Sequence, residues 1–403
     1  MFRLIAALGL LAFVTPLATD MYLPAFPHLM DELHSGASGI QLTLTAFLLG
    51  MGLGQLILGP LSDRFGRRVP LLAGAATMVA ASAACATLSS LGTLIVLRFV
   101  QGFSGSAGVV IGRAVITDVT RGDRAAKLFG TLMTLTGIAP IIAPIIGGTL
   151  TESTGWRGIF WVLTGASALA LLGAALFLPE SLPSDRRHTG GPQATLRALR
   201  GVLADRAYLG YTLSFCLAFA MLFSYIAGSA FLFQKVLGLS VGHGSLAFAT
   251  IGIVGTLASM TGTKLVGRFS PNGLLRTGLY VMLACTATLC TVALAGRLSL
   301  TLTMVLLCLV FIGMRLVTAN AGALAMARVP HASGSGSAVL GTLQSALSAV
   351  AAPLVGLGGE HTAVPMFISM TLCAALALLS LLLTRGTTAA AATAGAQSEP
   401  ARV

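Results

Sequence analysis

The sequence predicts an all-α membrane protein whose twelve transmembrane helices form two pseudo-symmetric halves of six. Composition is the first observation: 56% of the 403 residues are hydrophobic and only 9% are charged, whereas soluble domains carry about 25% charged residues. The second is the length of the uncharged runs, such as residues 4–17, which approach the ~20 residues that a helix needs to cross lipid. Such runs exclude a β-barrel, whose strands alternate lipid-facing and lumen-facing residues.

Polar breaks divide the chain into twelve predicted spans. They cover residues 4–27, 40–60, 69–90, 92–117, 126–150, 157–178, 208–234, 244–266, 274–295, 299–324, 336–357 and 363–384. The longest break, the basic linker 179–207, separates an N-terminal half (1–178) from a C-terminal half (208–384). Residues 385–403 are expected to form a disordered tail.

The basic residues predict the orientation in the membrane. Twelve spans put both termini on one side, where 18 of the 24 Lys and Arg residues then lie, against three on the other side. Because basic loops stay in the cytoplasm, we expect both termini, the linker and the tail to be cytoplasmic. The net charge of +12 therefore reflects membrane orientation, and we expect no nucleic-acid partner.

Two segments recur at equivalent places in the two halves. GPLSDRFGRRVPLLAG (59–74), after the second span, aligns with TKLVGRFSPNGLLRTG (263–278), after the eighth. APIIG (143–147) in the fifth span aligns with APLVG (352–356) in the eleventh. Internal repeats of this kind are typical of transporters, whose substrate site lies between the repeats near the bilayer midplane.

Asp20 is the only one of the 12 acidic residues that lies clearly within a predicted span. An ionisable group inside a membrane indicates function by default, with a partner to be named. We name Arg98, which lies at a similar depth in the fourth span, as that partner, directly or through water. Burial favours the neutral acid and a nearby arginine favours the charged one, so the pair is predicted to couple proton binding to transport. A static pair that only fixes helix packing is the alternative.

Several motifs resemble those of the major facilitator superfamily. GPLSDRFGRR (59–68) resembles its loop motif between the second and third helices. LRFVQGFSGSAG (97–108) and GIAPIIAPIIGG (137–148) are similar to the fourth-helix and fifth-helix motifs of its drug/proton antiporters. TDMYLP (19–24), QLTLTAFLLGMGLGQL (41–56) and SYIAGSAFLFQKVLGLS (224–240) resemble the Bcr/CflA group, which includes bicyclomycin and chloramphenicol exporters.

The resemblance implies the major facilitator fold and proton-coupled efflux of small amphipathic drugs by alternating access, in the bacterial inner membrane, with Asp20 as proton carrier. The motifs do not separate a drug from a natural metabolite, such as a nucleoside, an amino acid derivative or a biosynthetic product. We expect a monomer in lipid that uses the proton gradient and no cofactor. Some relatives carry a second acid where this chain has Ala12, so exchange of one proton for a neutral or zwitterionic substrate is expected rather than export of cations.

The resemblance implies that the loop motif acts as a conformational latch that favours the outward-open state. The glycines permit tight turning, and Asp63 can face a positive helix N-terminus. Asp118, at the end of the fourth span, is the expected partner of Arg67. Basic loops also stay in the cytoplasm for topological reasons alone, which is the alternative. The latch comprises Gly59, Asp63, Arg64, Gly66, Arg67 and Asp118.

The fifth span is predicted to bend and to slide against the other half. It contains Gly137, Pro140, Pro144, Gly147 and Gly148. Each proline removes a backbone donor, and small residues let helices approach closely. The matching APLVG segment suggests the eleventh span as the partner, and a kinked helix without a mechanistic role is the alternative.

Nine residues are predicted to line the substrate cavity. Aromatic residues of the seventh span offer an adaptable apolar wall, although lipid-facing packing is the alternative for any one of them. Arg315, in the tenth span, can select an anionic or polar group or snorkel to the interface. The set is Thr19, Asp20, Tyr22, Gly105, Phe219, Phe223, Tyr225, Phe231 and Arg315.

Other classes of protein fit the sequence less well. It contains no GxxxxGK[ST] phosphate loop, so ATP is not expected to drive transport directly. It contains no HExxH motif and no cluster of metal ligands, so neither an enzyme nor a metal site is predicted. Twelve spans in two related halves favour alternating access over a channel.

Overall fold

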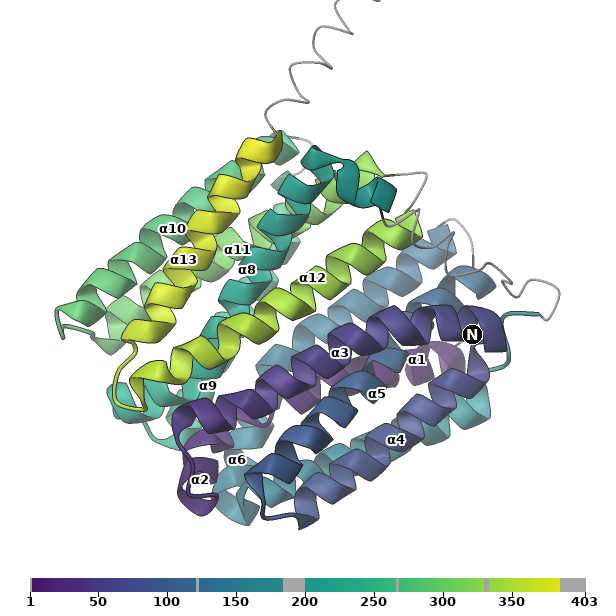
Figure 1. Cartoon of the computed structure of the whole chain (residues 1–403), viewed down its shortest axis with the longest axis horizontal. Helices are drawn as coiled ribbons and strands as arrows, with labels where there is room; N and C mark the ends of the chain where they lie inside the picture. Colours follow the sequence, from purple (N-terminus) through teal and green to yellow (C-terminus); the bar gives the residue numbers. More distant parts are fainter. Residues whose placement is uncertain (1, 121–122, 184–199, 266–267, 330–332, 385–403) are drawn as a thin grey trace, which may run out of the picture.

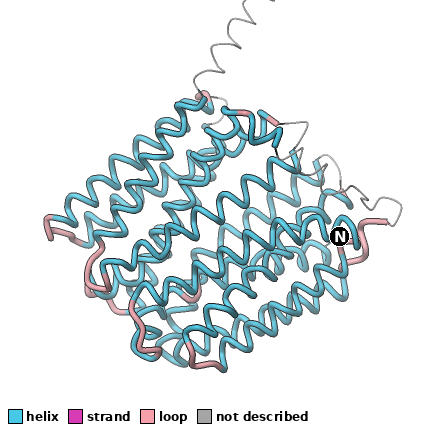
Figure 2. Tube along the Cα trace, viewed as in Figure 1, coloured by secondary structure: helices cyan, strands magenta, loops and turns pink. Residues whose placement is uncertain are grey.

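The computed structural model describes residues 2–120, 123–183, 200–265, 268–329 and 333–384, and these are helical almost throughout (Figure 2). Lipid offers no partners to backbone polar groups, so a spanning segment must satisfy them within its own helix. The apolar runs of the sequence therefore become long helices joined by short loops. The predicted tail 385–403 and much of the predicted linker lie outside the described residues.

In the described part of the chain twelve α-helices carry the architecture, with shorter helical turns at several ends; Figure 1 shows their arrangement. The helices are α1 (Phe2–Asp20), α2 (Phe26–Glu32), α3 (Ala37–Phe65), α4 (Arg68–Thr87), α5 (Leu91–Val119), α6 (Asp123–Phe177), α8 (Arg206–Phe231), α9 (Val241–Leu265), α10 (Pro271–Leu294), α11 (Leu300–Arg328), α12 (Ser333–Leu354) and α13 (Val364–Ser380). The shorter turns are η1 (Leu23–Ala25), η3 (Leu232–Val236), η5 (Val355–Gly358) and η6 (Leu381–Thr384).

The predicted number of membrane crossings is consistent with these helices. Eleven helical segments of the described chain are long and apolar enough to span a membrane. One of them belongs to α6, whose 55 residues would extend about 80 Å, more than twice the ~30 Å hydrocarbon core. Gly155 interrupts α6 with a φ of +71°, a backbone conformation that glycine adopts readily. The two parts of α6 correspond to the predicted spans 126–150 and 157–178, which gives twelve crossings.

The helices form two bundles that lie side by side (Figure 1). In the N-terminal half α3 packs on α5, and α1 and α4 pack on α6. In the C-terminal half α10 packs on α11, and α8 packs on α12 and α13. The halves meet where α3 packs on α12 and where α6 packs on α9.

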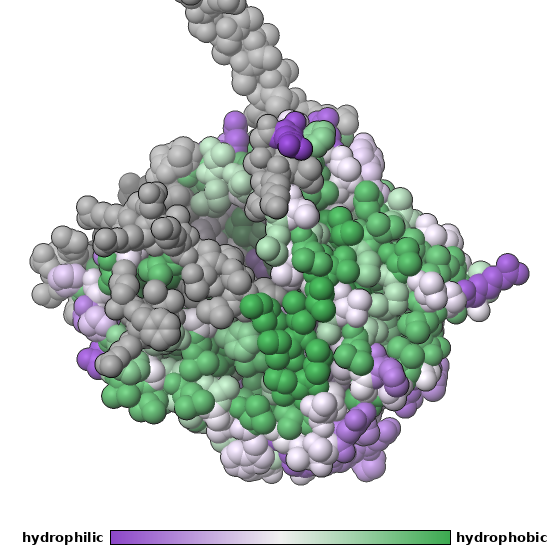
Figure 3. Space-filling model, turned by 180° about the vertical axis from the view of Figure 1, so that it is seen from behind, coloured by the Kyte–Doolittle hydropathy of each residue, from purple (hydrophilic) through white to green (hydrophobic). Residues whose placement is uncertain are grey.

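The two ends of the bundle are named here by their loops. The linker end carries residues 66–67 and 178–183, and the distal end carries residues 33–36, 237–240 and 359–363. The surface between the ends is apolar: Leu169, Leu176 and Leu257 are each more than half exposed. Figure 3 shows hydrophobic residues over the middle of one face and hydrophilic residues gathered toward its edges. This is the surface that a protein embedded in lipid requires.

Candidate functional site

Asp20 is the last residue of α1. A proline has no backbone N–H and its ring clashes with the carbonyl four residues earlier, and Pro24 stands four residues after Asp20. The helix therefore ends at Asp20, and the chain continues through η1 (Leu23–Ala25) into α2. The predicted span over residues 4–27 corresponds to one candidate membrane span, Ala6–Glu32, whose helix is interrupted directly after Asp20.

Arg98 caps this helix end from the neighbouring helix α5. Its side chain is fully buried, and its Nη1 donates to the carbonyl of Ala18 at 2.9 Å and to Gln101 Oε1 at 3.0 Å. The guanidinium also lies over the rings of Tyr22 and Phe47, at 4.8 and 4.5 Å from their centroids. A cation at a helix C-terminus complements the partial negative charge of the last carbonyls, so Arg98 holds the broken end of α1 in place.

Asp20 and Arg98 are thus joined through the last turn of α1 rather than by a direct ion pair. Asp20 is buried, with 4% of its surface exposed, and no ion pair within the described chain includes it. Arg98 retains two buried nitrogens, Nε and Nη2, without a protein partner. The direct contact is therefore not formed in this conformation, and a contact through water stays a prediction.

Most of the predicted cavity residues are packed rather than open. Tyr22 and Tyr225 are fully buried and Phe231 nearly so. The Tyr22 hydroxyl is 3.1 Å from Thr43 Oγ1, and the Phe231 ring lies against Phe26. In this conformation these rings fill the contact near the distal end, so their role as an apolar wall of the substrate cavity stays a prediction.

The remaining cavity residues are placed as follows. Thr19 is buried and donates to the carbonyl of Pro16 at 2.9 Å, and the carbonyl of Gly105 accepts from Thr15 at 3.2 Å. Phe223 is nearly buried, whereas Gly105, Phe219 and Arg315 are partly exposed. Of the predicted cavity residues, these three are therefore the ones that can face an open cavity in this conformation.

The fifth-span motif packs at the break in α1. A Cβ atom on Gly147 would overlap the carbonyl oxygen of Met21, and one on Gly148 would overlap the side chain of Ser245 in α9. The packing around Gly137 lies outside what the structure describes. Only glycine at position 147 lets α6 come this close to the backbone of Met21. The motif that is predicted to slide therefore touches the residue next to Asp20.

The partner of this motif differs from the expected one. The eleventh span was expected, but α6 packs on α9, the eighth span, and α12, the eleventh, packs on α3. A pseudo-twofold relation exchanges the fifth span with the eleventh and the second with the eighth. By this relation the contact of the fifth span with the eighth is equivalent to the contact of the eleventh span with the second.

Hydrogen bonds between the halves close the distal end. Gln41 Nε2 in α3 donates to the carbonyl of Ala227 in α8 at 3.1 Å, and Gln234 Nε2 donates to the carbonyl of Pro24 at 3.1 Å. Glu152 in α6 accepts a hydrogen bond from the backbone N–H of Gly242 at the start of α9, at 3.1 Å. These contacts could not be predicted from the sequence, since single polar residues near span ends carry no signal of their own.

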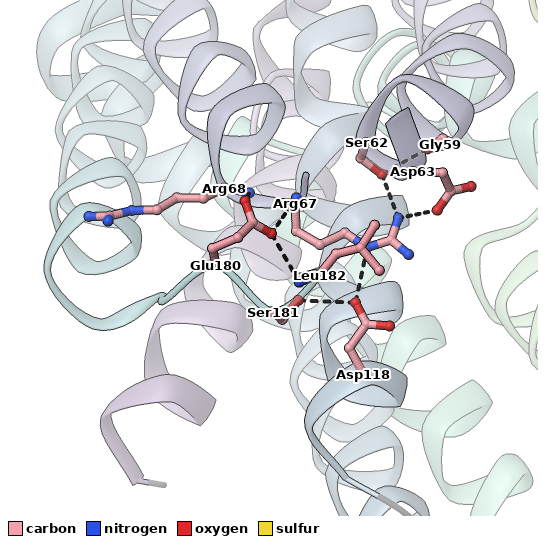
Figure 4. Close-up of polar contacts among 9 residues, drawn as sticks. All are labelled: Gly59, Ser62, Asp63, Arg67, Arg68, Asp118, Glu180, Ser181 and Leu182. Carbon is pink, nitrogen blue, oxygen red and sulfur yellow. Dashed lines mark hydrogen bonds and ion pairs between the residues drawn. The ribbon is translucent and has the colours of Figure 1, made fainter. Parts of the chain in front are cut away.

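The predicted latch is an ion-pair cluster at the linker end (Figure 4). Arg67 Nε lies 3.0 Å from Asp118 Oδ2, and Arg67 Nη1 contacts Asp63 and donates to Ser62 Oγ at 2.8 Å. The expected Arg67–Asp118 contact is present. Gly66 joins α3 to α4 with a φ of +92°, which only glycine adopts without strain.

Three further residues near this cluster have contacts of their own. Arg64 stands outside it, with its guanidinium over the Phe65 ring. The carbonyl of Gly59 accepts from Ser62 Oγ at 2.7 Å. Glu180, which the sequence analysis did not select, accepts hydrogen bonds from the backbone N–H groups of Arg67 and Arg68 at 2.8 and 3.2 Å (Figure 4). A carboxylate is favourable at a helix N-terminus, and its position just after the sixth span was the available signal.

Replacing Arg67 by Met is expected to weaken the linker end of the N-terminal half. The change leaves Asp63 and Asp118 without their cation, and a hydrogen bond to a charged group contributes about 1.5–3 kcal/mol. The unfolding free energy, measured in mixed micelles, should fall by about that amount, and transport should fall with it. The exposed Arg64, replaced by Met, is the control, and equal effects of the two changes would contradict a special role for Arg67.

Comparison with known proteins identifies the family. The model described as Major Facilitator Superfamily matches residues 8–353. The chain belongs to the major facilitator superfamily. It is therefore a multi-pass membrane transporter and not an enzyme.

Relatives within the superfamily agree with the motifs. The chain is 38% identical to the uncharacterized MFS-type transporter YdgK of Bacillus subtilis (strain 168), over 93% of each chain. It is 29% identical to the bicyclomycin resistance protein homolog of Haemophilus influenzae, over 94% of this chain and 95% of that one. It is 32% identical to a chloramphenicol resistance protein of Pseudomonas aeruginosa, over 70% and 64%. These relatives confirm the resemblance to the Bcr/CflA drug-efflux group.

Solved structures agree with the fold. A bacterial homologue of the human lysosomal transporter Spinster, in an inward-facing and unoccupied conformation, has a TM-score of 0.78 at 16% identity, with 94% of this chain and 96% of that chain covered. A D-xylose–proton symporter has a TM-score of 0.68 at 17% identity, over 95% and 96%. The predicted major facilitator fold is confirmed.

Proposed function

We propose that this chain exports small amphipathic drugs of the chloramphenicol or bicyclomycin type in exchange for protons, by alternating access. The observation that carries the proposal is Asp20, a buried carboxylate without an ion-pair partner at the broken end of α1. It lies beside Met21, where α6 approaches α1 through Gly147. A group in this place can sense both its proton and the helix contacts that change during transport.

The electrostatics of Asp20 favour a cycle of proton binding and release. A buried charge without a partner is costly, and a helix C-terminus disfavours an anion. Arg98 offsets part of that cost through the same turn of α1. Proton entry removes the charge at Asp20, which releases the substrate on one side of the membrane, and proton loss restores the charge when the site faces the other side.

The orientation follows from the basic loops. The linker end carries the Arg67 cluster and is assigned to the cytoplasm under the positive-inside rule. The distal end, closed by the hydrogen bonds of Gln41, Gln234 and Glu152, then faces outward. We propose a monomer in the bacterial inner membrane with both termini cytoplasmic, in an inward-facing conformation.

Two motifs would govern the conformational change. In this conformation the described contacts of the Arg67 cluster lie within the N-terminal half and the first residues of the linker. Asp63, which is 40% exposed, remains accessible to the other half, and this supports a latch that engages when the linker end closes. The glycines and prolines of α6 would let it slide on α9.

Transport by purified protein in liposomes tests the proposal. An imposed proton gradient is expected to drive chloramphenicol or bicyclomycin against its concentration, and each drug gradient should in turn move protons. A protein that carries neither drug but moves a nucleoside or an amino acid derivative with protons would replace drug export by metabolite transport. Movement of drug without proton flux would refute coupling.

A further inference from the structure

Arg315 is a membrane-embedded cation that the proton mechanism does not use. It lies near the middle of α11, one turn after Phe311. A Cβ atom on Gly255 of α9 would lie 3.4 Å from Arg315 Nε and 3.6 Å from the Phe311 ring. The guanidinium therefore lies directly against the backbone of α9, where glycine leaves room for it.

The side of α9 that Arg315 touches faces the protein interior. The exposed large hydrophobic residues of α9 repeat at helical spacing and mark its lipid side; they are Leu246, Ile253, Leu257 and Met260. Gly255 is buried and lies on the opposite side, at an angle of about 180° from them at 100° per residue. A snorkelling arginine on the lipid side would not reach this position, so Arg315 is directed inward.

Arg315 has no counterion in the described chain. No ion pair includes it, and its Nε is buried without a hydrogen-bond partner. An arginine inside a membrane is costly and normally faces a partner or a water-filled path. Since the described protein supplies no partner, the free donors are available to a ligand.

An aromatic cluster adjoins this cation. The Tyr225 ring stacks on Phe248 with centroids 5.2 Å apart and meets the edge of Phe311 at 5.0 Å. The buried Tyr225 hydroxyl also lacks a hydrogen-bond partner within the described chain. Phe311 of this cluster lies one turn from Arg315, which is the residue closer to the linker end along α11.

We propose that Arg315 binds the anionic group of an amphipathic substrate, so that this transporter accepts organic acids and zwitterions. A guanidinium presents parallel N–H donors that match the two oxygens of a carboxylate. The apolar part of the substrate would pack near Phe311, toward the Tyr225 cluster. Outward movement of an anion is also favoured by a membrane potential that is negative inside. This inference rests on the proposed export function and adds organic acids and zwitterions to the neutral drugs named there.

Equilibrium binding to the purified full-length protein in nanodiscs tests the inference. The probes are nalidixic acid at pH 8 and its neutral ethyl ester, which differ in the carboxylate charge. The Arg315→Gln variant should bind the acid roughly tenfold more weakly or worse, as expected for the loss of a charge-assisted hydrogen bond, and should bind the ester as wild type does. Arg315→Lys should retain part of the preference for the acid, and the exposed Arg297, replaced by Gln, should change nothing.

Several outcomes would overturn the inference. Equal loss of acid and ester in Arg315→Gln would mean a structural role, and unchanged binding of the acid would mean no role. A wild-type protein that prefers the ester would also contradict the proposal. Binding is measured without a proton gradient, so its result does not depend on proton coupling. If the acid binds but is not transported by a proton gradient, the proposed function is refuted and the proposed binding site is not.

Discussion

Proton-driven export should be lost when Asp20 is replaced by Asn. One proton entering through a membrane potential of 100 mV releases about 2.3 kcal/mol, which sustains a concentration ratio of about 50-fold because each 1.4 kcal/mol is a factor of ten. The Asn side chain has nearly the same shape as protonated Asp but cannot release a proton. The variant should therefore not sustain that concentration ratio of the drug. A pump-deficient bacterium that carries it should be no more drug-resistant than one that carries the empty vector.

Exchange measurements separate coupling from folding in this variant. The neutral amide would resemble the protonated state of Asp20, so exchange of labelled drug for unlabelled drug, without any gradient, should continue. Asp31, an exposed acid on α2, is the matched control, and its replacement by Asn should leave export intact. Full proton dependence in Asp20→Asn would exclude Asp20 as the proton carrier.

The largest loss of stability is expected when Arg98 is replaced by Ala. Its side chain is fully buried and supports the last turn of α1 through the Ala18 carbonyl and Gln101. Removing it leaves these acceptors unpaired and opens a void between Tyr22 and Phe47. Breaking a buried charged contact typically costs about 3–5 kcal/mol, so the unfolding free energy in mixed micelles should fall by about that amount.

Two comparisons define what Arg98 contributes. The exposed Arg276, replaced by Ala, should change the unfolding free energy by less than about 0.5 kcal/mol. Arg98→Lys keeps the charge but lacks the planar fork, so it should recover only part of the stability. If Arg98→Ala unfolds like Arg276→Ala, then Arg98 does not hold the end of α1, and the link from Asp20 to Arg98 through that turn fails.

Several features could be predicted because they depend on one helix at a time. The apolar runs had to become spanning helices, since lipid leaves the backbone no other partner. Asp20 could be selected because it is the single acid within a predicted span. The Arg67–Asp118 contact was accessible because span order places both residues at the same end of the bundle.

Other features depend on how helices pack against each other and were missed or placed differently. The break of α1 beside Asp20, its cap by Arg98 and the burial of Tyr225 all require a specific rotation of neighbouring helices. The pairing of α6 with α9 depends on how the two halves meet, which short sequence repeats do not specify.

The sequence alone thus determined which segments cross the membrane, on which side the basic loops are expected, the family of motifs and the one intramembrane carboxylate. Only the tertiary structure decided that Asp20 ends a helix, that Arg98 bonds to that helix end rather than to the carboxylate, and that Arg315 faces the interior without a counterion. The reason is physical: hydropathy is a property of each segment along the chain. Rotation and register arise from close contacts such as Gly147 on Met21 and Gly255 on Arg315, which exist only after distant segments have packed.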